Sequence, residues 1–228
     1  MRFRDFLTEW SNMSKGIRRE MESKGYKFLG AGVDQAAYLE PKTGKVLKIF
    51  GTQYEDYTDD NGFTREHLMF KHWADYCAKR KGNIFLPKFD GWESFEYEGN
   101  KYLQIRMERL APLPNQLAVA LHRLTDVIDN SLNPSKFIKN ILKHAADLSA
   151  YNKSIGPYDE ELTLDKKETL EIEKLVVLLG EEKFTEFLKT MLELARLASK
   201  SGYTFDLHGR NFMHRNDGTP VIVDPWVI

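Results

Sequence analysis

The stretch FDLHGRNFM, residues 205–213, sets Asp206 and Asn211 five positions apart among apolar residues. A second stretch, VIVDPW at 221–226, ends an apolar run on another carboxylate, Asp224. The Asn-Asp-Gly sequence between the two is typical of the tight turn of a β-hairpin. We therefore expect a closing hairpin that brings one amide and two carboxylates to one place.

Oxygen ligands of this kind suit a magnesium ion that is shared between a protein and nucleotide phosphates. If Asn211 and Asp224 bind the metal, Asp206 is left to accept a proton from an attacking hydroxyl group. Taken singly, each of these residues is also typical of an Asx turn or a cap. Their combination and order favour a metal and nucleotide site.

A lysine upstream lies inside an apolar strand sequence, VLKIF at 46–50. Strand alternation puts Val46, Lys48 and Phe50 on one face, where an ammonium group requires an anionic partner. The alternative is a lysine whose stem packs against its neighbours while its head reaches water, which is the commoner case for a single lysine.

A helix predicted at 62–80, with Asn61 or Thr64 as its cap, offers the anionic partner. One stripe of this helix contains a single charged residue, Glu66, among the residues Phe63, Phe70, Trp73 and Cys77. A carboxylate on an inward-facing stripe is costly unless it is paired. We therefore expect Glu66 to pair with Lys48.

The sequence LGAGVDQAAYLE, residues 29–40, contains two glycines between strand-like residues. At Gly30 and Gly32 the missing side chains would let backbone N–H groups approach phosphate oxygens. An ordinary hairpin explains the same pattern. A strand follows the glycines and no Walker lysine is present, which disfavours P-loop and Rossmann sites.

Composition excludes several classes of protein. The 228 residues are 42% hydrophobic, which argues against a generally disordered chain. The net charge of -1 gives no electrostatic case for nucleic acid as a partner. Cys77 is the only cysteine, so neither an intrachain disulfide nor a cysteine zinc cluster is expected. Charges interrupt the apolar runs well short of the ~20 residues of a membrane span. We expect a cytoplasmic protein without a membrane partner, and the sequence carries no signal for oligomeric state.

The chain has a strand-rich front and a helical back. In the front half we expect an opening helix at 5–24, a hairpin whose strands meet at 41–44, and a second hairpin that turns at Gly99-Asn100. In the back half, hydrophobic periodicity predicts helices at 115–130, 134–150, 166–180 and 182–200, followed by the closing hairpin.

Taken in order, the glycines, the strand lysine, the helix glutamate, the Asp-x4-Asn loop and the last aspartate resemble the protein-kinase-like superfamily. That superfamily also contains the aminoglycoside and choline type kinases. The resemblance covers nearly the whole chain. It implies a single α+β domain with a bilobal protein-kinase-like fold. The β-rich N-lobe would span 1–110, and a truncated, mainly helical C-lobe would span 111–228 and end just after the metal-binding aspartate.

The resemblance also implies ATP and Mg²⁺ as cofactors. Gly30 and Gly32 would lie over the phosphates, and Lys48, paired with Glu66, would hold them. The adenine would stack and hydrogen-bond on a hinge made of Met107, Glu108 and Leu110.

For the reaction itself, the resemblance assigns the catalytic roles to Asp206, Lys48 and Asn211. Asp206 would orient and deprotonate the acceptor hydroxyl, while Asn211 and Asp224 would bind magnesium. We therefore expect an active enzyme that transfers the γ-phosphate of ATP to a hydroxyl group, with Ser and Thr side chains of proteins as the first candidates for the acceptor.

Several positions depart from the protein-kinase pattern. Gln35 replaces the third glycine, Thr204-Phe205 replaces the His-Arg before the catalytic aspartate, and Pro225-Trp226 replaces the Phe-Gly after the metal aspartate. His208 stands where Ser/Thr kinases carry lysine and where small-molecule kinases often carry histidine. None of these changes removes a phosphate or metal ligand.

Two alternative functions remain, one with a different acceptor and one without catalytic activity. A small-molecule kinase would be favoured by His208 and, for a polyamine acceptor, by the acidic run Asp159, Glu160 and Glu161, for which a solvated loop is the simpler explanation. A pseudokinase that binds a nucleotide or a partner is the other. Because the sequence ends at Ile228, we expect no activation loop, and this compact ending is similar to that of kinases encoded by bacteriophages.

Overall fold

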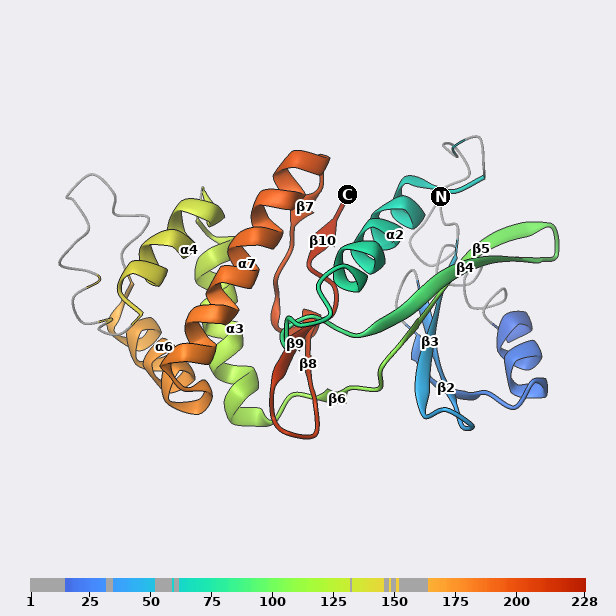
Figure 1. Ribbon diagram of the computed structural model, residues 1–228, viewed down its shortest axis with the longest axis horizontal. Coiled ribbons are helices and arrows are strands. Elements are labelled where there is room, and N and C mark those ends of the chain that lie inside the picture. Colours follow the sequence, from blue (N-terminus) through green and yellow to red (C-terminus); the bar gives the residue numbers. More distant parts are fainter. Residues whose placement is uncertain are drawn as a thin grey trace, which may run out of the picture. The chain divides into compact units, whose positions relative to one another are not determined.

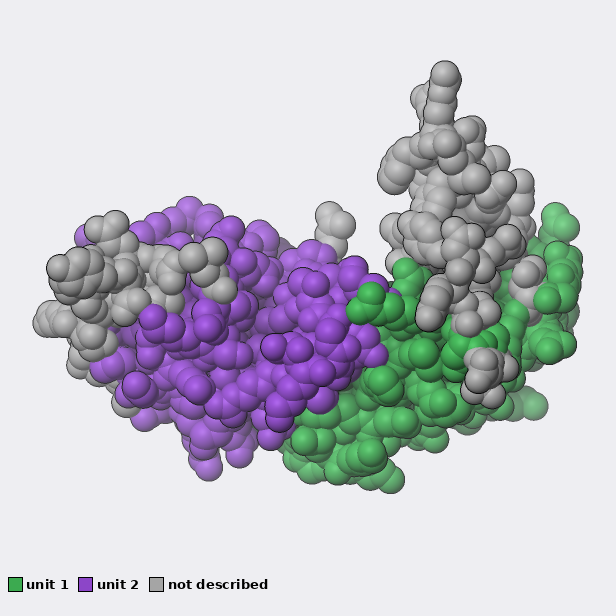
Figure 2. Space-filling view, turned by 90° about the horizontal axis from the view of Figure 1, so that it is seen from above, with its two compact units in different colours: residues 1–109 green, residues 110–228 purple. Residues whose placement is uncertain are grey.

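The computed structural model describes residues 15–31, 35–51, 59, 62–131, 133–145, 148, 151 and 164–228. The chain is an α+β protein, as the sequence predicted at that coarse level. It divides into two compact units, Met1–Arg109 and Leu110–Ile228, coloured green and purple in Figure 2. Across the described ranges, we find no helix with the length and apolar character needed to cross a membrane.

Unit 1 is built on an antiparallel five-stranded sheet with the order β1-β2-β3-β5-β4 (Figure 1). Its strands are β1 (Lys27–Ala31), β2 (Gln35–Glu40), β3 (Lys45–Phe50), β4 (Phe89–Tyr97) and β5 (Asn100–Met107). The predicted turn at 41–44 is confirmed. The second hairpin turns one residue earlier than predicted. Glu98 and Gly99 both have positive φ, as a two-residue hairpin turn of type I′ requires, and Asn100 already pairs with Tyr97.

Helices pack on both faces of this sheet (Figure 1). The helix at 15–23 is the described part of the predicted opening helix, and residues 1–14 lie outside the described ranges. It buries Ile17 and Met21 against a cluster of sheet residues that comprises Ala36, Tyr38, Leu47, Ile49 and Tyr102. Because Lys48 lies between Leu47 and Ile49, strand alternation directs its side chain to the opposite face.

The opposite face carries α2 (Arg65–Ala78), which confirms the predicted helix in its central part. Its cap is Thr64, and the other candidate, Asn61, lies outside the described residues. The rings of Phe50 on β3 and Phe70 on α2 are centred 4.0 Å apart. Aromatic packing of this kind fixes the helix against the end of β3.

Unit 2 has a helical body made of α3 (Asn115–Asp129), α4 (Pro134–Lys143), α6 (Lys166–Leu179) and α7 (Glu181–Ser201). Helix α3 packs on α6, and α4 packs on α7. The predicted helix at 134–150 was too long, because the chain leaves helical geometry at His144, where φ is -118°. The remaining helices agree with the sequence prediction to within one or two residues.

Short strands complete unit 2. A three-stranded sheet has the order β6-β8-β9, and a separate pair joins β10 to β7. Their bounds are β6 (Ala111–Pro112), β7 (Thr204–Phe205), β8 (Phe212–His214), β9 (Pro220–Ile222) and β10 (Trp226–Val227). Helix α7 ends at Gly202, whose left-handed φ of 69° turns the chain into β7. The buried indole of Trp226 donates a hydrogen bond to the carbonyl of Leu194 at 3.2 Å, which anchors β10 on α7.

Candidate functional site

The loop from Asp206 to Asn211 is held together by its own hydrogen bonds. Its last three residues form a 3₁₀ turn, η3 (Gly209–Asn211), in which the N–H of Asn211 donates to the carbonyl of His208 at 2.8 Å. The side-chain amide nitrogen of Asn211 donates to the carbonyl of Asp206, also at 2.8 Å. Asn211 is only 7% exposed, so its amide is fixed in the loop. Its amide nitrogen serves the loop, and its amide oxygen is the atom suited to a cation.

Two backbone hydrogen bonds place Asp224 beside this loop. The N–H of Asp206 donates to the carbonyl of Pro225 at 2.9 Å, and the N–H of Val223 donates to the carbonyl of Asn211 at 2.8 Å. The residues that immediately follow and precede Asp224 are thus bonded to the first and last residues of the loop. The backbone of unit 2 therefore brings Asp206, Asn211 and Asp224 close to one another, as expected from the predicted closing hairpin.

The β7–β10 pair completes this arrangement and was not predicted. Trp226 pairs with Phe205 and Val227 with Thr204, so the chain just after Asp224 runs antiparallel to the chain just before Asp206. Each strand is two residues long, which is too short for hydrophobic alternation to reveal. The only signal was a valine and a tryptophan close to the end of the sequence.

The side chains around Asp206 are partly open to solvent. The Asp206 carboxyl is 35% exposed, and His208 Nε2 lies 4.0 Å from its Oδ2. A half-buried carboxylate with an imidazole nearby can accept a proton from a hydroxyl group.

The donor set fits a magnesium ion that is shared with a ligand. The two carboxylates and one amide are hard oxygen donors, and magnesium completes its octahedral shell with water and phosphate oxygens. Within the described part of the chain, no group of three or more His, Cys, Asp or Glu side chains is arranged to hold a metal.

Unit 1 brings two of the predicted nucleotide-binding residues into one row of the sheet. Ala37 of β2 pairs with Gly30 on one side and with Lys48 on the other. Residues directly opposite in a sheet point to the same face, so Gly30 and Lys48 share it. A Cβ built on Gly30 would meet nothing within 4 Å. Packing within the protein therefore does not require a glycine there, which fits a backbone that a ligand approaches closely. Gly32 lies outside the described residues.

Met107 belongs to the same face of the sheet. It pairs with Val46, two residues from the pair between Lys48 and Ile105, and it is buried. The chain that follows is fixed by Glu108, whose N–H donates to the carbonyl of Lys88 at 2.9 Å and whose Oε1 accepts from the N–H of Lys88 at 2.8 Å. Leu110, the last predicted hinge residue, is the first residue of unit 2.

Glu66 lies one turn before Phe70 on α2, on the side of the helix that meets Phe50. Like Lys48, it is partly buried. This placement supports the predicted pairing of Glu66 with Lys48, which stays a prediction.

His67 has a specific structural role at the start of α2. It is 1% exposed and completes a capping box, in which His67 N–H donates to Thr64 Oγ1 and His67 Nδ1 accepts from the N–H of Thr64. Its Nε2 lies 3.2 Å from the carbonyl oxygen of Phe50. A neutral imidazole with the proton on Nε2 satisfies both contacts. Burial lowers the pKa of His67, which favours this neutral form. The imidazole thus ties the start of α2, with Glu66, to the end of β3, with Lys48.

No motif in the sequence indicated that α3 contributes to the site in unit 2. It contacts η3, with His122 against Gly209, and Asp129 in its last turn lies near Asp206 and His208 of the loop. Burial raises the pKa of Asp129 to about 6, although more than a third of the residue as a whole is exposed. The only available signal was an acidic residue in the last turn of a helix, where the helix dipole disfavours it.

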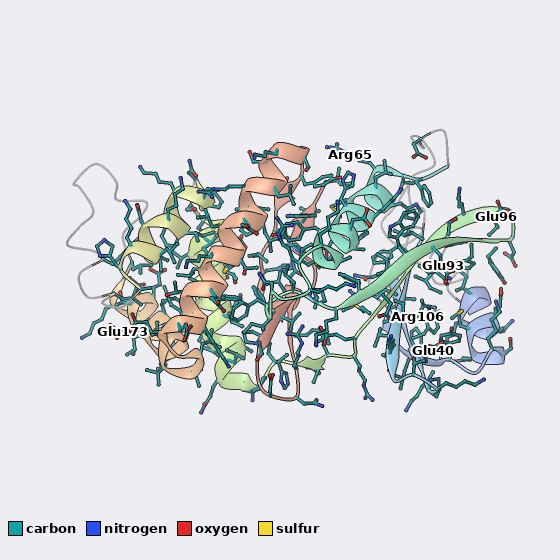
Figure 3. All side chains as sticks on the ribbon, viewed as in Figure 1. Glu40, Arg65, Glu93, Glu96, Arg106 and Glu173 are labelled. Atoms are coloured by element: carbon teal, nitrogen blue, oxygen red, sulfur yellow. The ribbon has the colours of Figure 1, made fainter. Side chains whose placement is uncertain are left out.

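Two other features are separate from these residues. Arg106 and Glu40, labelled in Figure 3, form an ion pair with Nε 3.7 Å from Oε2, on the sheet face opposite Lys48. A groove between α3 and α6, near Glu173 in Figure 3, is lined mainly by apolar side chains of Val119, Leu170, Val177 and Leu178. It lies at the first turns of α3, whereas Asp129 lies at the last.

No protein-family model matches the chain, and no curated protein matches it significantly.

Proposed function

We propose that the protein is an ATP- and magnesium-dependent phosphotransferase with a bilobal, protein-kinase-like architecture, which transfers the γ-phosphate to a hydroxyl group. The pair of backbone hydrogen bonds on either side of Asp224 carries this proposal. They support a site in which two metal ligands and a proton acceptor converge from the loop and from the end of the closing hairpin.

In unit 2, each of the three side chains has its own task. Asp206 orients the acceptor hydroxyl and takes its proton as the new oxygen–phosphorus bond forms and the bond between the γ-phosphorus and the leaving ADP breaks. Asn211 and Asp224 supply oxygen ligands for magnesium. When bound, magnesium neutralises negative charge on the phosphate oxygens. Because Asn211 also donates to the Asp206 carbonyl, the ligand and the proton acceptor are held in one geometry.

In unit 1, the face of the sheet that carries Gly30, Lys48 and Met107 binds the nucleotide. Lys48 holds the α- and β-phosphates with its ammonium group, and Glu66 orients it. The Gly30 backbone would lie over the phosphates, since the space that a Cβ would take is open. Met107, Glu108 and Leu110 hold the adenine. Most of the rate enhancement comes from positioning and charge neutralisation by these groups.

The proposed acceptor is a Ser or Thr side chain of a protein. His208 favours the second candidate, a kinase for hydroxylated small molecules, because its Nε2 lies 4.0 Å from Asp206 Oδ2. An imidazole there is placed to contact a small acceptor bound at Asp206. The acidic residues Asp159, Glu160 and Glu161 lie outside the described residues.

The test is transfer of phosphate from γ-labelled ATP in the presence of magnesium, with the purified protein alone and with a bacterial lysate. Asp206→Ala and Asp224→Ala should each lower the rate by about a hundredfold or more. Asp217→Asn is the matched control. It removes a carboxylate from the turn of the same hairpin but keeps an oxygen that accepts from the N–H of Thr219.

Labelled protein bands that disappear in both alanine variants would support a protein kinase. Label confined to small molecules would select the second candidate. ATP binding without any transfer would contradict the proposal and point to a nucleotide-binding pseudokinase. A rate that survives Asp206→Ala would show that the proton acceptor has been misassigned.

A further inference from the structure

Gln35 is the first residue of β2, and it belongs to the face of the sheet that carries Lys48. It pairs with Phe50 of β3, while Ala37, two residues further along β2, pairs with Lys48. Residues two apart on a strand share a face, and so do residues directly opposite on neighbouring strands. The Gln35 side chain therefore emerges on the face where Gly30 and Lys48 lie.

Three successive rows cross this face, each formed by residues that pair on neighbouring strands: Val46 with Met107, then Lys48 with Ala37, then Phe50 with Gln35. A strand advances by about 3.4 Å per residue, so neighbouring rows lie about 7 Å apart. Met107 and Gln35 are thus on opposite sides of the Lys48 row. A nucleotide with its adenine at Met107 and its α- and β-phosphates at Lys48 directs its γ-phosphate toward the row of Gln35.

The amide oxygen of Gln35 is buried without a hydrogen-bond partner among the described residues. The next residues in its row are Phe50 and Leu103, whose buried apolar side chains offer no donor. Three further buried side-chain atoms without a partner belong to the opposite face of the sheet, on Tyr38, Tyr102 and Arg106. Of these four atoms, only Gln35 Oε1 is on the face proposed to bind the nucleotide.

Packing within the protein does not explain an amide at this position. A buried polar atom without a partner destabilises the folded state, and native proteins contain few of them. An amide carries two N–H donors as well as an acceptor oxygen. No hydrogen bond to a described residue holds either end of the Gln35 amide, so it can turn about its last torsion and present Nε2 to an acceptor that a ligand supplies.

We propose that Gln35 is a nucleotide-binding residue that distinguishes ATP from ADP, because its Nε2 donates a hydrogen bond to an oxygen of the γ-phosphate. Phosphate oxygens are charged acceptors, and hydrogen bonds to them are stronger than those between neutral groups. This inference rests on the proposed phosphotransferase function for the presence of the nucleotide on this face. The unpaired amide and its effect on stability do not depend on that function.

The experiment measures the binding of two nucleotides to the full chain by calorimetry in the presence of Mg²⁺. The ligands are ADP and the β,γ-imido analogue of ATP, which keeps a γ-phosphate but resists cleavage. Gln35→Leu removes the amide at similar volume, whereas Gln35→Glu keeps the length and replaces the donor with a negative charge. Melting temperatures without nucleotide are measured in parallel.

Gln104→Leu is the matched control. It makes the same change on β5 of the same sheet, at a residue that pairs with Ile49 and so lies on the face opposite Lys48. The Gln104 amide already has a partner, because its Nε2 donates to Glu93 Oε1.

In Gln35→Leu, the Kd for the ATP analogue should rise by about tenfold or more, since a hydrogen bond to a charged group is lost. The Kd for ADP should stay unchanged, because ADP has no γ-phosphate. Gln35→Glu should weaken binding of the analogue further, because the new carboxylate repels the phosphate. The melting temperature of Gln35→Leu should equal or exceed that of the wild type, since an apolar group replaces an unpaired amide. Gln104→Leu should bind both nucleotides like the wild type.

The outcomes separate this inference from the proposed function. A wild type that binds neither nucleotide would refute both. A wild type that binds both nucleotides but transfers no phosphate would refute the function, while a selective loss of the analogue in Gln35→Leu would still support the contact. Unchanged binding of the analogue in Gln35→Leu would overturn the inference alone, as would equal losses for the two nucleotides. A melting temperature of Gln35→Leu clearly below that of the wild type would also overturn it, because the amide would then have a partner within the protein.

Discussion

Gly30 and Lys48 flank the same residue of β2, Ala37, and so lie in one row on one face of the sheet in unit 1. A side chain at position 30 would emerge on the face from which Lys48 reaches out. Because the space above Gly30 is open, the glycine is not needed for packing. Its φ is also not in the left-handed region, so backbone strain does not require it.

Gly30→Ala should therefore leave the fold intact and weaken nucleotide binding. The unfolded chain loses conformational freedom in the variant, so the free energy of unfolding should stay equal or rise by up to about 1 kcal/mol. The new methyl group should raise the KM for ATP by about tenfold, which corresponds to about 1.4 kcal/mol. Denaturant titration and initial rates measure the two effects. Gly82→Ala, at another glycine with open space, is the control: the free energy of unfolding should respond as in Gly30→Ala, and the KM for ATP should stay unchanged.

Lys48→Met should abolish most of the phosphotransfer without unfolding the protein. Methionine keeps much of the apolar stem, while loss of the ammonium group removes its charge from the phosphates. We expect kcat/KM to fall by about a hundredfold or more. The matched control is Lys45→Met on the same strand, since Lys45 forms an exposed ion pair with Asp90 that contributes about 1 kcal/mol or less. Comparable losses in the two variants would contradict a specific role for Lys48.

His67→Ala should destabilise unit 1 substantially. The variant loses the cap at Thr64, the contact with the Phe50 carbonyl and the volume of a buried ring. Together these should lower the free energy of unfolding by about 2–4 kcal/mol, measured by denaturant titration. His67→Gln should lose less, because glutamine is a regular partner in a capping box. His72→Ala, at an exposed position on the same helix, is the control. Stability equal to the wild type in His67→Ala would refute the role of the imidazole as a tie.

The lowered pKa of His67 predicts the direction in which stability changes with pH. Burial lowers the pKa of His67 from its ordinary value of 6.5, so the folded state binds this proton less tightly than the unfolded state. Its contribution is therefore complete above pH 6.5 and is lost as the pH falls through the folded pKa. Asp129 acts in the opposite direction, because its pKa is raised from 3.8 to about 6 and its ionisation costs stability as the pH rises between these values.

The difference between the wild type and His67→Gln isolates the histidine. From about pH 7.5 to about pH 5.5, the wild type should lose on the order of 1 kcal/mol more stability than the variant. Unfolding curves at the two pH values provide the measurement. Parallel losses in both proteins would show that another group controls the slope.

The sequence predicted the features that depend on local pattern. The alternation around Lys48, the stripe through Glu66 and the turn at 216–218 all became the expected elements, because periodicity and turn chemistry are written in neighbouring residues. It missed contacts that join distant segments. The β7–β10 pair is too short to be periodic, and α3 has no fixed sequence spacing from the turn η3 that it contacts. His67 escaped notice because glutamate or glutamine is the expected third residue of a capping box.

Asn211 combines two tasks that a single substitution can separate. Its amide nitrogen donates to the Asp206 carbonyl, and its amide oxygen is the proposed magnesium ligand. Asn211→Asp keeps an oxygen ligand and adds charge, but it removes the donor and sets two oxygens against each other. The magnesium concentration for half-maximal rate should therefore not rise, while kcat should fall by about tenfold or more because the loop loses a hydrogen bond that orients Asp206. Magnesium titrations of the initial rate measure both quantities. Asn216→Asp, in the exposed turn of the same hairpin, controls for added charge and should leave both near the wild-type values. A variant that needs much more magnesium at an unchanged kcat would reverse the assignment, and would show that Asn211 serves the metal without holding the loop.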